Sequence, residues 1–149
     1  MEKYQSSSAG QTKKLGFNLA KRILKIKPSR KAVVLALSGN LGSGKTTFIQ
    51  GLAKGLGIKK RITSPTFLLI KKFPLRHKNI KNVFHIDAYR LKKPAALKKL
   101  GFAEMTNSPS SIVLIEWAEK IKPILPPKII WLKFDYGKKS TERKIKISL

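Results

Sequence analysis

The feature that most constrains the fold of this chain is the run from Gly39 to Thr46, which reads Gly-Asn-Leu-Gly-Ser-Gly-Lys-Thr. The run follows a continuous apolar segment, Ala32 to Leu37, which is typical of a buried strand in a parallel sheet. The run leads into a predicted helix, Lys45 to Leu56, and Gly57 is well placed to end that helix. Strand, glycine-rich turn and helix in this order indicate an α/β domain with a mostly parallel sheet.

The same run matches the Walker A pattern in full, and Thr47 extends it. Glycines allow the backbone to curl so that several N–H groups point at one phosphate, and the start of a helix adds its positive end. Lys45 would place its charge on the β- and γ-phosphates, and Thr46 would offer a hydroxyl to Mg²⁺. We expect the Lys45 ammonium to face solvent when no nucleotide is bound. The predicted cofactors are therefore ATP and Mg²⁺, and the residues predicted to hold them in the loop are Gly39, Asn40, Leu41, Gly42, Ser43, Gly44, Lys45, Thr46 and Thr47.

One of the seven acidic residues, Glu116, directly follows four apolar residues, Ile112 to Ile115. A P-loop needs an acid at the end of a neighbouring strand to hold Mg²⁺ or its waters, and Glu116 has the required position. The alternative is a carboxylate at a strand end in solvent. Trp117 beside it either packs over the site or closes the core.

A second acid, Asp87, ends the sequence His85-Ile86-Asp87. Strand alternation puts His85 and Asp87 on one face, which could look onto the phosphates. Alternatively, Asp87 caps a turn before Tyr89. Ser64-Pro65-Thr66 follows the predicted helix, where many P-loop proteins keep a segment that senses the γ-phosphate, although alone it is typical of an ordinary turn.

The remaining patterns complete a three-layer, P-loop NTPase-like α/β domain that occupies residues 1–149 as a single unit. A helix is predicted from Gln11 to Lys27, with Thr12 as its N-cap and Pro28 ending it. A short helix is predicted from Pro94 to Leu100. Further strands are predicted at Phe67–Phe73, Val83–Ile86, Lys128–Tyr136 and Arg143–Ser148, the last two forming an antiparallel edge hairpin.

The charge balance is extreme, with 33 basic residues against 7 acidic ones and a net charge of +26. Such a charge fits a polyanionic partner such as tRNA. However, the 27 lysines outnumber the 6 arginines and are spread along the whole chain, which favours a compositional origin. The lack of cysteine excludes disulfides and thiolate metal sites, and no run approaches the roughly 20 apolar residues of a membrane span. We therefore expect no membrane association and a cytoplasmic location.

Several motifs occur in a specific order around the Walker A run. These are GNLGSGKTTFIQGLAKGLGI, ITSPTF, HIDAYRL, LGFAEM, IVLIEWAEKI and LPP. In this order and at these separations the chain resembles the TsaE (YjeE-type) family, from the Thr12 helix to the final strands. The set is specific, whereas the Walker A run alone is not.

The resemblance implies a weak ATPase that works with the TsaB and TsaD proteins to make threonylcarbamoyladenosine beside the anticodon of tRNA. TsaD would carry the transfer chemistry, and ATP hydrolysis would reset or drive the complex between turnovers. The resemblance also implies roles for individual residues: Asp87, Glu116 and Thr66 in catalysis, Thr46, Glu116 and Asp87 at Mg²⁺, and Trp117 beside the nucleotide. Two positions depart from the family pattern: Asn40, where many members have Asp, and Ala88, where a larger apolar residue is usual.

Two other classes stay open. A small nucleotide or metabolite kinase would need a second substrate pocket and usually an arginine-bearing lid, for which six arginines and no long insertion give little support. A nucleotide-gated binding module would use the same P-loop residues with hydrolysis incidental. A GTPase is disfavoured because no Asn-Lys-x-Asp motif is present.

Overall fold

The structure is a computed structural model that describes residues 1–63 and 70–149. The predicted switch residues Ser64, Pro65 and Thr66 lie outside the described residues. The first three residues of the strand predicted at Phe67–Phe73 also lie outside them.

The centre of the fold is a seven-stranded sheet with the order β1-β7-β6-β2-β5-β4-β3. The strands are β1 (Glu2–Ser6), β2 (Val33–Ser38), β3 (Ile70–Pro74), β4 (Asn82–Asp87), β5 (Ser111–Glu116), β6 (Ile130–Tyr136) and β7 (Arg143–Ser148). The four central strands β6, β2, β5 and β4 are parallel, whereas β7 and β3 run antiparallel to their neighbours. The predicted, mostly parallel sheet with an antiparallel hairpin on one side is confirmed. Strand β1 pairs with the outer side of that hairpin, and the β3 edge is antiparallel as well.

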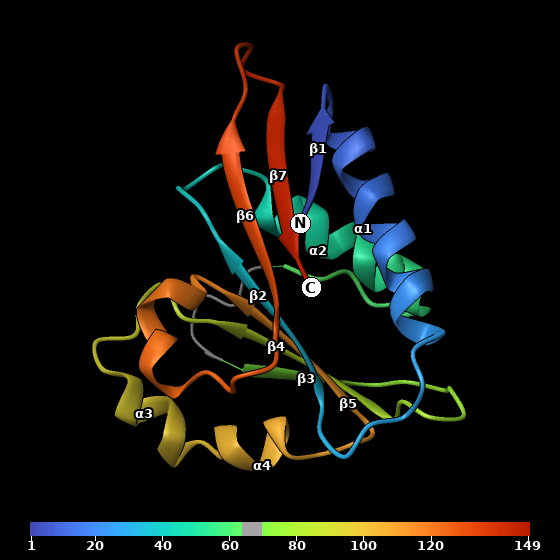
Figure 1. Ribbon diagram of the computed structural model, residues 1–149, viewed down its shortest axis with the longest axis vertical. Helices are drawn as coiled ribbons and strands as arrows, with labels where there is room; N and C mark the ends of the chain where they lie inside the picture. Colours follow the sequence, from blue (N-terminus) through green and yellow to red (C-terminus); the bar gives the residue numbers. More distant parts are fainter. Residues whose placement is uncertain (64–69) are drawn as a thin grey trace.

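Helices cover both faces of the sheet, as the predicted three-layer domain requires (Figure 1). They are α1 (Ala9–Leu24), α2 (Lys45–Leu56), α3 (Pro94–Lys99), α4 (Phe102–Thr106) and the 3₁₀ helix η1 (Ala118–Ile124). On β2, Leu35 and Leu37 belong to the core beneath α1 and α2, whereas Val34 and Ala36 belong to the core beneath the other helices. Both faces of β2 are therefore buried, which explains its continuous apolar run.

Helices α1 and α2 pack through glycines at very close range. A Cβ added to Gly51 would lie 2.0 Å from the carbonyl oxygen of Lys13, and one added to Gly16 would lie 2.2 Å from that of Phe48. Because only glycine permits this approach, α2 is held in a fixed position against α1, and its N-terminus is fixed with it.

Several element boundaries differ from the predictions. The predicted cap Thr12 is wrong: helix α1 begins earlier, and Ser8 is its N-cap, accepting a hydrogen bond from the Gln11 amide. Thr12 is instead buried and hydrogen-bonded to Ser6 of β1, with 2.7 Å between the two hydroxyl oxygens. Helix α1 also ends at Leu24, before the predicted end at Lys27.

Three elements were not predicted: β1, α4 and η1. Among the described residues, strand β1 pairs with β7 alone, and the alternation of partly and fully exposed residues from Glu2 to Gln5 carries little apolar signal. Helix α4 and η1 are each shorter than two turns of α-helix, too short for hydrophobic periodicity to be detected. Among the described residues, no helix is both long enough and apolar enough to cross a membrane.

Candidate functional site

The loop between β2 and α2 has the backbone that its glycines allow. Gly39, Gly42 and Gly44 have φ angles of 144°, 74° and 101°, which side chains rarely tolerate. At Gly39 an added Cβ would also lie 2.5 Å from the carbonyl oxygen of Phe134. Gly44 is the N-cap of α2, and its carbonyl accepts the 2.9 Å hydrogen bond from Phe48 N–H. The curled loop and the helix N-terminus therefore adjoin, as phosphate binding requires.

Lys45 does not face solvent, contrary to our expectation. Its side chain is buried, and its Nζ donates to the carbonyl oxygens of Gly39 at 2.6 Å and Asn40 at 3.0 Å. The ammonium also lies 4.1 Å from the centre of the Trp117 ring. Burial lowers the pKa of Lys45, and the negative charge of Glu116 opposes that shift. The Lys45 side chain folds back onto the loop, where these two carbonyl oxygens replace water as acceptors for its ammonium group.

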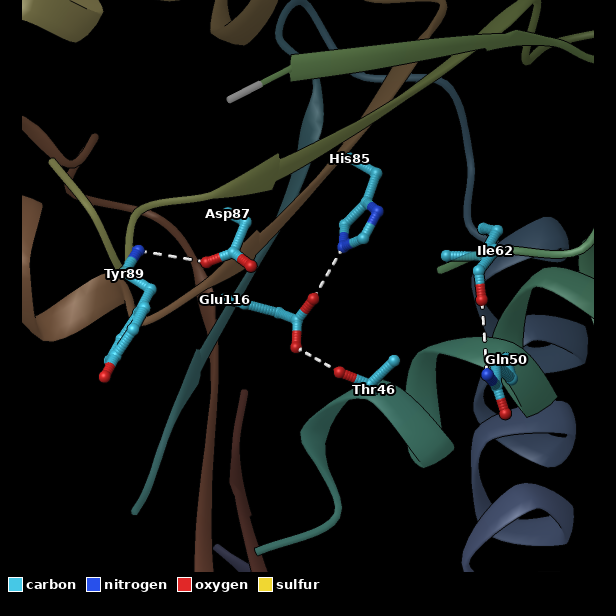
Figure 2. Close-up of polar contacts among 7 residues, drawn as sticks. All are labelled: Thr46, Gln50, Ile62, His85, Asp87, Tyr89 and Glu116. Carbon is cyan, nitrogen blue, oxygen red and sulfur yellow. Dashed lines mark hydrogen bonds and ion pairs between the residues drawn. The ribbon is translucent and has the colours of Figure 1, made fainter. Parts of the chain in front are cut away.

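Glu116, at the end of β5, joins the loop helix to β4 (Figure 2). Its Oε1 accepts from the Thr46 hydroxyl at 2.8 Å, and its Oε2 lies 2.7 Å from His85 Nε2. Glu116 and His85 are buried, with 2% and 0% exposure. The alternative of a solvated strand end is therefore wrong for Glu116. A buried carboxylate with two hydrogen-bond partners is held in one orientation, with its charge beside the loop.

Asp87, at the end of β4, is the direct neighbour of Glu116 in the parallel register of β4 and β5. Its Oδ1 accepts a 2.9 Å hydrogen bond from the Tyr89 amide, so the predicted turn-capping contact is present. Burial raises the pKa of Asp87, as does the charge of Glu116, while the Tyr89 amide and Lys45 lower it. Asp87 therefore caps a turn and also lies at the strand edge next to the loop.

Trp117 adopts a left-handed backbone conformation with φ of 59°, uncommon for a bulky residue. The conformation turns the chain from β5 into η1 and places the indole between two groups, the Lys45 ammonium and the Tyr89 ring at 4.9 Å between ring centres. Both predicted alternatives hold in part, because the ring packs over the lysine of the loop and Trp117 also packs against the core beneath α3 and η1.

The predicted residues thus converge from three parallel strand ends: the loop after β2, Glu116 after β5 and Asp87 after β4. Leu41 is exposed and Thr47 is half-buried in the first turn of α2. Thr66 lies outside the described residues, so its assignment stays a prediction.

Sequence reasoning gave little weight to His85, yet this residue fixes Glu116. Within the described part of the chain its Nδ1 has no hydrogen-bond partner although it is buried. The signal available was its shared strand face with Asp87. Gln50 was also missed: its side-chain amide donates to the Ile62 carbonyl at 3.2 Å and so joins α2 to the segment before Ser64 (Figure 2). No local pattern would have predicted that contact.

The oxygen donors at the site suit Mg²⁺, a hard cation that takes few protein ligands and keeps several waters. Thr46, Glu116 and Asp87 supply a hydroxyl and two carboxylates at adjacent strand and helix ends. No group of three or more His, Cys, Asp or Glu residues able to hold a metal occurs among the described residues. A hydroxyl and two carboxylates leave coordination positions of Mg²⁺ for water and for a phosphate ligand.

The fold and loop define the class: a P-loop NTPase-like α/β protein. The model of the family described as threonylcarbamoyl adenosine biosynthesis protein TsaE matches residues 6–145. The chain belongs to the TsaE family.

Relatives of the chain carry the name tRNA threonylcarbamoyladenosine biosynthesis protein TsaE. The one from Haemophilus influenzae is 37% identical over 123 residues, covering 83% of this chain and 75% of the relative. The one from Bacillus subtilis is 40% identical over 93 residues, covering 62% of this chain and 55% of the relative. A Rickettsia felis protein is 39% identical over 121 residues, covering 80% of this chain and 64% of the relative.

A crystal structure described as Bacillus subtilis YdiB has the same fold, with a TM-score of 0.75 and 28% identity. The similarity covers 98% of this chain and 83% of that one.

Proposed function

We propose that this protein binds and hydrolyses Mg-ATP to support the formation of threonylcarbamoyladenosine in tRNA, in the cytoplasm and together with TsaB and TsaD. The observation that carries the proposal is the hydrogen bond between the Thr46 hydroxyl and Glu116, 2.8 Å long. It joins two of the three residues expected at Mg²⁺, and these two are 70 residues apart in the chain. The names of the relatives supply the biological context of tRNA modification.

The loop residues would bind and orient the nucleotide. Backbone N–H groups between Gly39 and Thr46 would receive the phosphates, and the N-terminus of α2 would add its positive end. Lys45 would exchange its present acceptors, the carbonyl oxygens of Gly39 and Asn40, for phosphate oxygens. Because that ammonium is already largely desolvated, its charge would be screened less by water than that of a surface lysine.

Glu116, Thr46 and Asp87 would act on the metal and the attacking water. Mg²⁺, when bound, neutralises charge that develops on the β- and γ-phosphates. His85 fixes one oxygen of Glu116, so that the other stays directed at Thr46. Asp87 lies one strand further along the edge. A carboxylate with a raised pKa accepts a proton more readily than a carboxylate with the usual low pKa. Asp87, whose pKa is raised, is therefore the candidate to accept the proton of the attacking water.

A multiple-turnover assay with purified TsaB, TsaD, threonylcarbamoyl donor and tRNA tests the role. The measured quantity is modified adenosine per TsaD molecule. We expect several products per TsaD with this protein and ATP, and about one or fewer without it. A Thr66→Ala variant should impair this turnover more than ATP affinity, because a segment that senses the γ-phosphate would transmit its state to partners.

The same assay distinguishes the proposal from the other classes. An equal yield with wild-type protein, with Lys45→Ala and with no addition would exclude the role even if the chain hydrolyses ATP. Phosphate transfer from ATP to a small acceptor would instead identify a kinase. Full support of turnover by a non-hydrolysable ATP analogue would identify an ATP-gated assembly module.

A further inference from the structure

The hairpin formed by β6 and β7 reaches the loop from the side opposite Glu116 and Asp87. Strand β6 is parallel to β2 and pairs with it on the side away from β5, so Tyr136 at its end lies at the same edge as the loop. The Tyr136 hydroxyl donates a hydrogen bond to the Leu41 carbonyl. The hairpin is therefore attached to the loop by a direct contact.

Arg143, the first residue of β7, lies against the last glycine of the loop. A Cβ built on Gly44 would be 3.6 Å from Arg143 Cγ, 3.7 Å from its Cδ and 3.7 Å from its Nε. Gly44 is the N-cap of α2, where the backbone N–H groups of a P-loop receive phosphate. The base of the guanidinium group therefore lies within van der Waals distance of the last glycine of the loop.

One side of the guanidinium is used by the hairpin. Arg143 Nη1 donates to the carbonyl oxygens of Ser140 at 2.6 Å and Glu142 at 2.7 Å, and the group lies 5.6 Å from the centre of the Tyr136 ring. Among the described residues, none accepts a hydrogen bond from Nε or Nη2. These two N–H groups form the edge of a guanidinium that can hold two oxygens of one phosphate.

The turn that carries Arg143 is itself well ordered by hydrogen bonds. Gly137 N–H donates to the Glu142 carbonyl at 2.9 Å, and the Glu142 amide donates to the Lys139 carbonyl at 3.0 Å. The Glu142 carboxylate accepts from the amides of Lys138 and Lys139. The guanidinium is therefore held before any ligand arrives, which lowers the entropic cost of binding one.

We propose that Arg143 binds the diphosphate portion of the nucleotide, at the α- and β-phosphates, through Nε and Nη2. The inference rests on the proposed ATP binding and adds a second cation, from β7, which lies on the side of β2 opposite β5 and β4. We assign Arg143 to the α- and β-phosphates because it lies next to Gly44 of the loop, whose backbone N–H groups bind those phosphates in a P-loop. Lys45 instead reaches the β- and γ-phosphates. Arg143 should consequently contribute equally to the binding of ADP and ATP.

The test compares dissociation constants of ADP and ATP, measured calorimetrically, for wild type, Arg143→Ala, Arg143→Lys and Lys144→Ala. Lys144 is the matched control, because it is the adjacent, exposed residue and its loss removes the same charge. We expect Arg143→Ala to weaken ADP and ATP alike, by about tenfold, as loss of one charge-assisted pair does. Arg143→Lys, which keeps the charge without the fork, should lose part of that affinity. Lys144→Ala should stay within about twofold of wild type.

Thermal unfolding of each variant shows whether the hairpin still folds. Equal affinities for Arg143→Ala and Lys144→Ala would overturn the inference, as would a loss confined to ATP. Wild-type protein that binds neither nucleotide would overturn the proposed function and this inference together. Wild-type binding that Arg143→Ala leaves intact would overturn only the role of Arg143.

Discussion

The two ends of helix α2 both carry positive charge, but they differ in what that charge contacts. At the N-terminal end, Lys45 is buried among carbonyl oxygens beside Trp117, and Glu116 is hydrogen-bonded to the next residue. At the C-terminal end, residues of α1, α2 and the segment after α2 line an open surface cavity of about 630 Å³. Its cationic lining residues are Lys13, Lys54, Lys59, Lys60 and Arg61, and no acid lines it among the described residues.

In a chain of net charge +26, the presence of a lysine or arginine does not by itself indicate a functional site. The difference between the two helix ends shows that specific contacts of the cation do indicate one. Lys45 has defined acceptors and a neighbouring acid, so its position is specified. The cations of the C-terminal cavity also face the negative end of the helix, which offsets part of their charge. They resemble the lysines distributed over the rest of the surface.

The largest effect should separate the two ends directly. Lys45→Ala and Lys54→Ala each remove one lysine from α2, at opposite ends. We expect Lys45→Ala to weaken ATP binding by about 100-fold, because it removes charge-assisted hydrogen bonds in a desolvated site. Lys54→Ala should change it less than about twofold. The measurement is ATP affinity by calorimetry, with circular dichroism to confirm folding. Equal losses in both variants would contradict the specificity of the N-terminal end.

The second prediction concerns the acids beside Lys45. Glu116→Gln and Asp87→Asn should lower Mg²⁺-dependent ATP hydrolysis by roughly 100-fold while nucleotide affinity changes only a few-fold, because these carboxylates act on charge developing in the transition state. Asp135→Asn, an acid on β6, is the control and should hydrolyse at the wild-type rate. Phosphate release at saturating ATP gives the rates. Parental rates in both test variants would refute their assignment to Mg²⁺ and catalysis.

A third, smaller effect concerns stability. Because burial raises the pKa of Asp87, the folded state holds the proton more tightly than the unfolded state, and ionisation of Asp87 destabilises the fold as pH rises. Asp87→Asn removes this penalty and can keep the acceptor for the Tyr89 amide. We expect a higher melting temperature at pH 7, by no more than about 4 °C. The gain should vanish at a pH where Asp87 is protonated in both states. A melting temperature below wild type at pH 7 would show that the charge stabilises the site.

The smallest effect is expected at the C-terminal cavity. Replacing Lys59, Lys60 and Arg61 by Ala should lower tRNA affinity no more than replacing Lys92, Lys98 and Lys99, exposed lysines around α3. Each removed charge should reduce the salt dependence by a similar small amount, a slope change of at most about 0.9 per lost phosphate contact. Filter binding at several salt concentrations around the physiological value, for tRNA and for an unrelated RNA of equal length, measures both the affinity and its salt dependence. A selective loss of tRNA binding in the cavity variant would assign a nucleic-acid site to this end of α2.

Much of the fold and most of the site could be predicted because their signals are local. The buried strand β2, the glycine turn and α2 follow one another directly in the sequence. The ends of β4 and β5 can be recognised because an acidic residue follows a mostly apolar segment. The β6–β7 hairpin follows from alternation on both sides of a glycine-containing turn. The edge strand β1 escaped prediction because a strand with one partner needs little apolar surface.

The sequence by itself determined the glycine-rich loop, the parallel sheet and the acids at the strand ends. These features depend on the conformational freedom of glycine, the alternation of side chains along a strand and the positions of turn residues, all of which involve only a few neighbouring residues. The tertiary structure alone decided that His85 holds Glu116, that the Lys45 ammonium turns inward beneath Trp117, and that the hairpin brings Arg143 to Gly44. These contacts join residues as many as 99 positions apart. Their partners are chosen by strand order and register, which no local pattern contains.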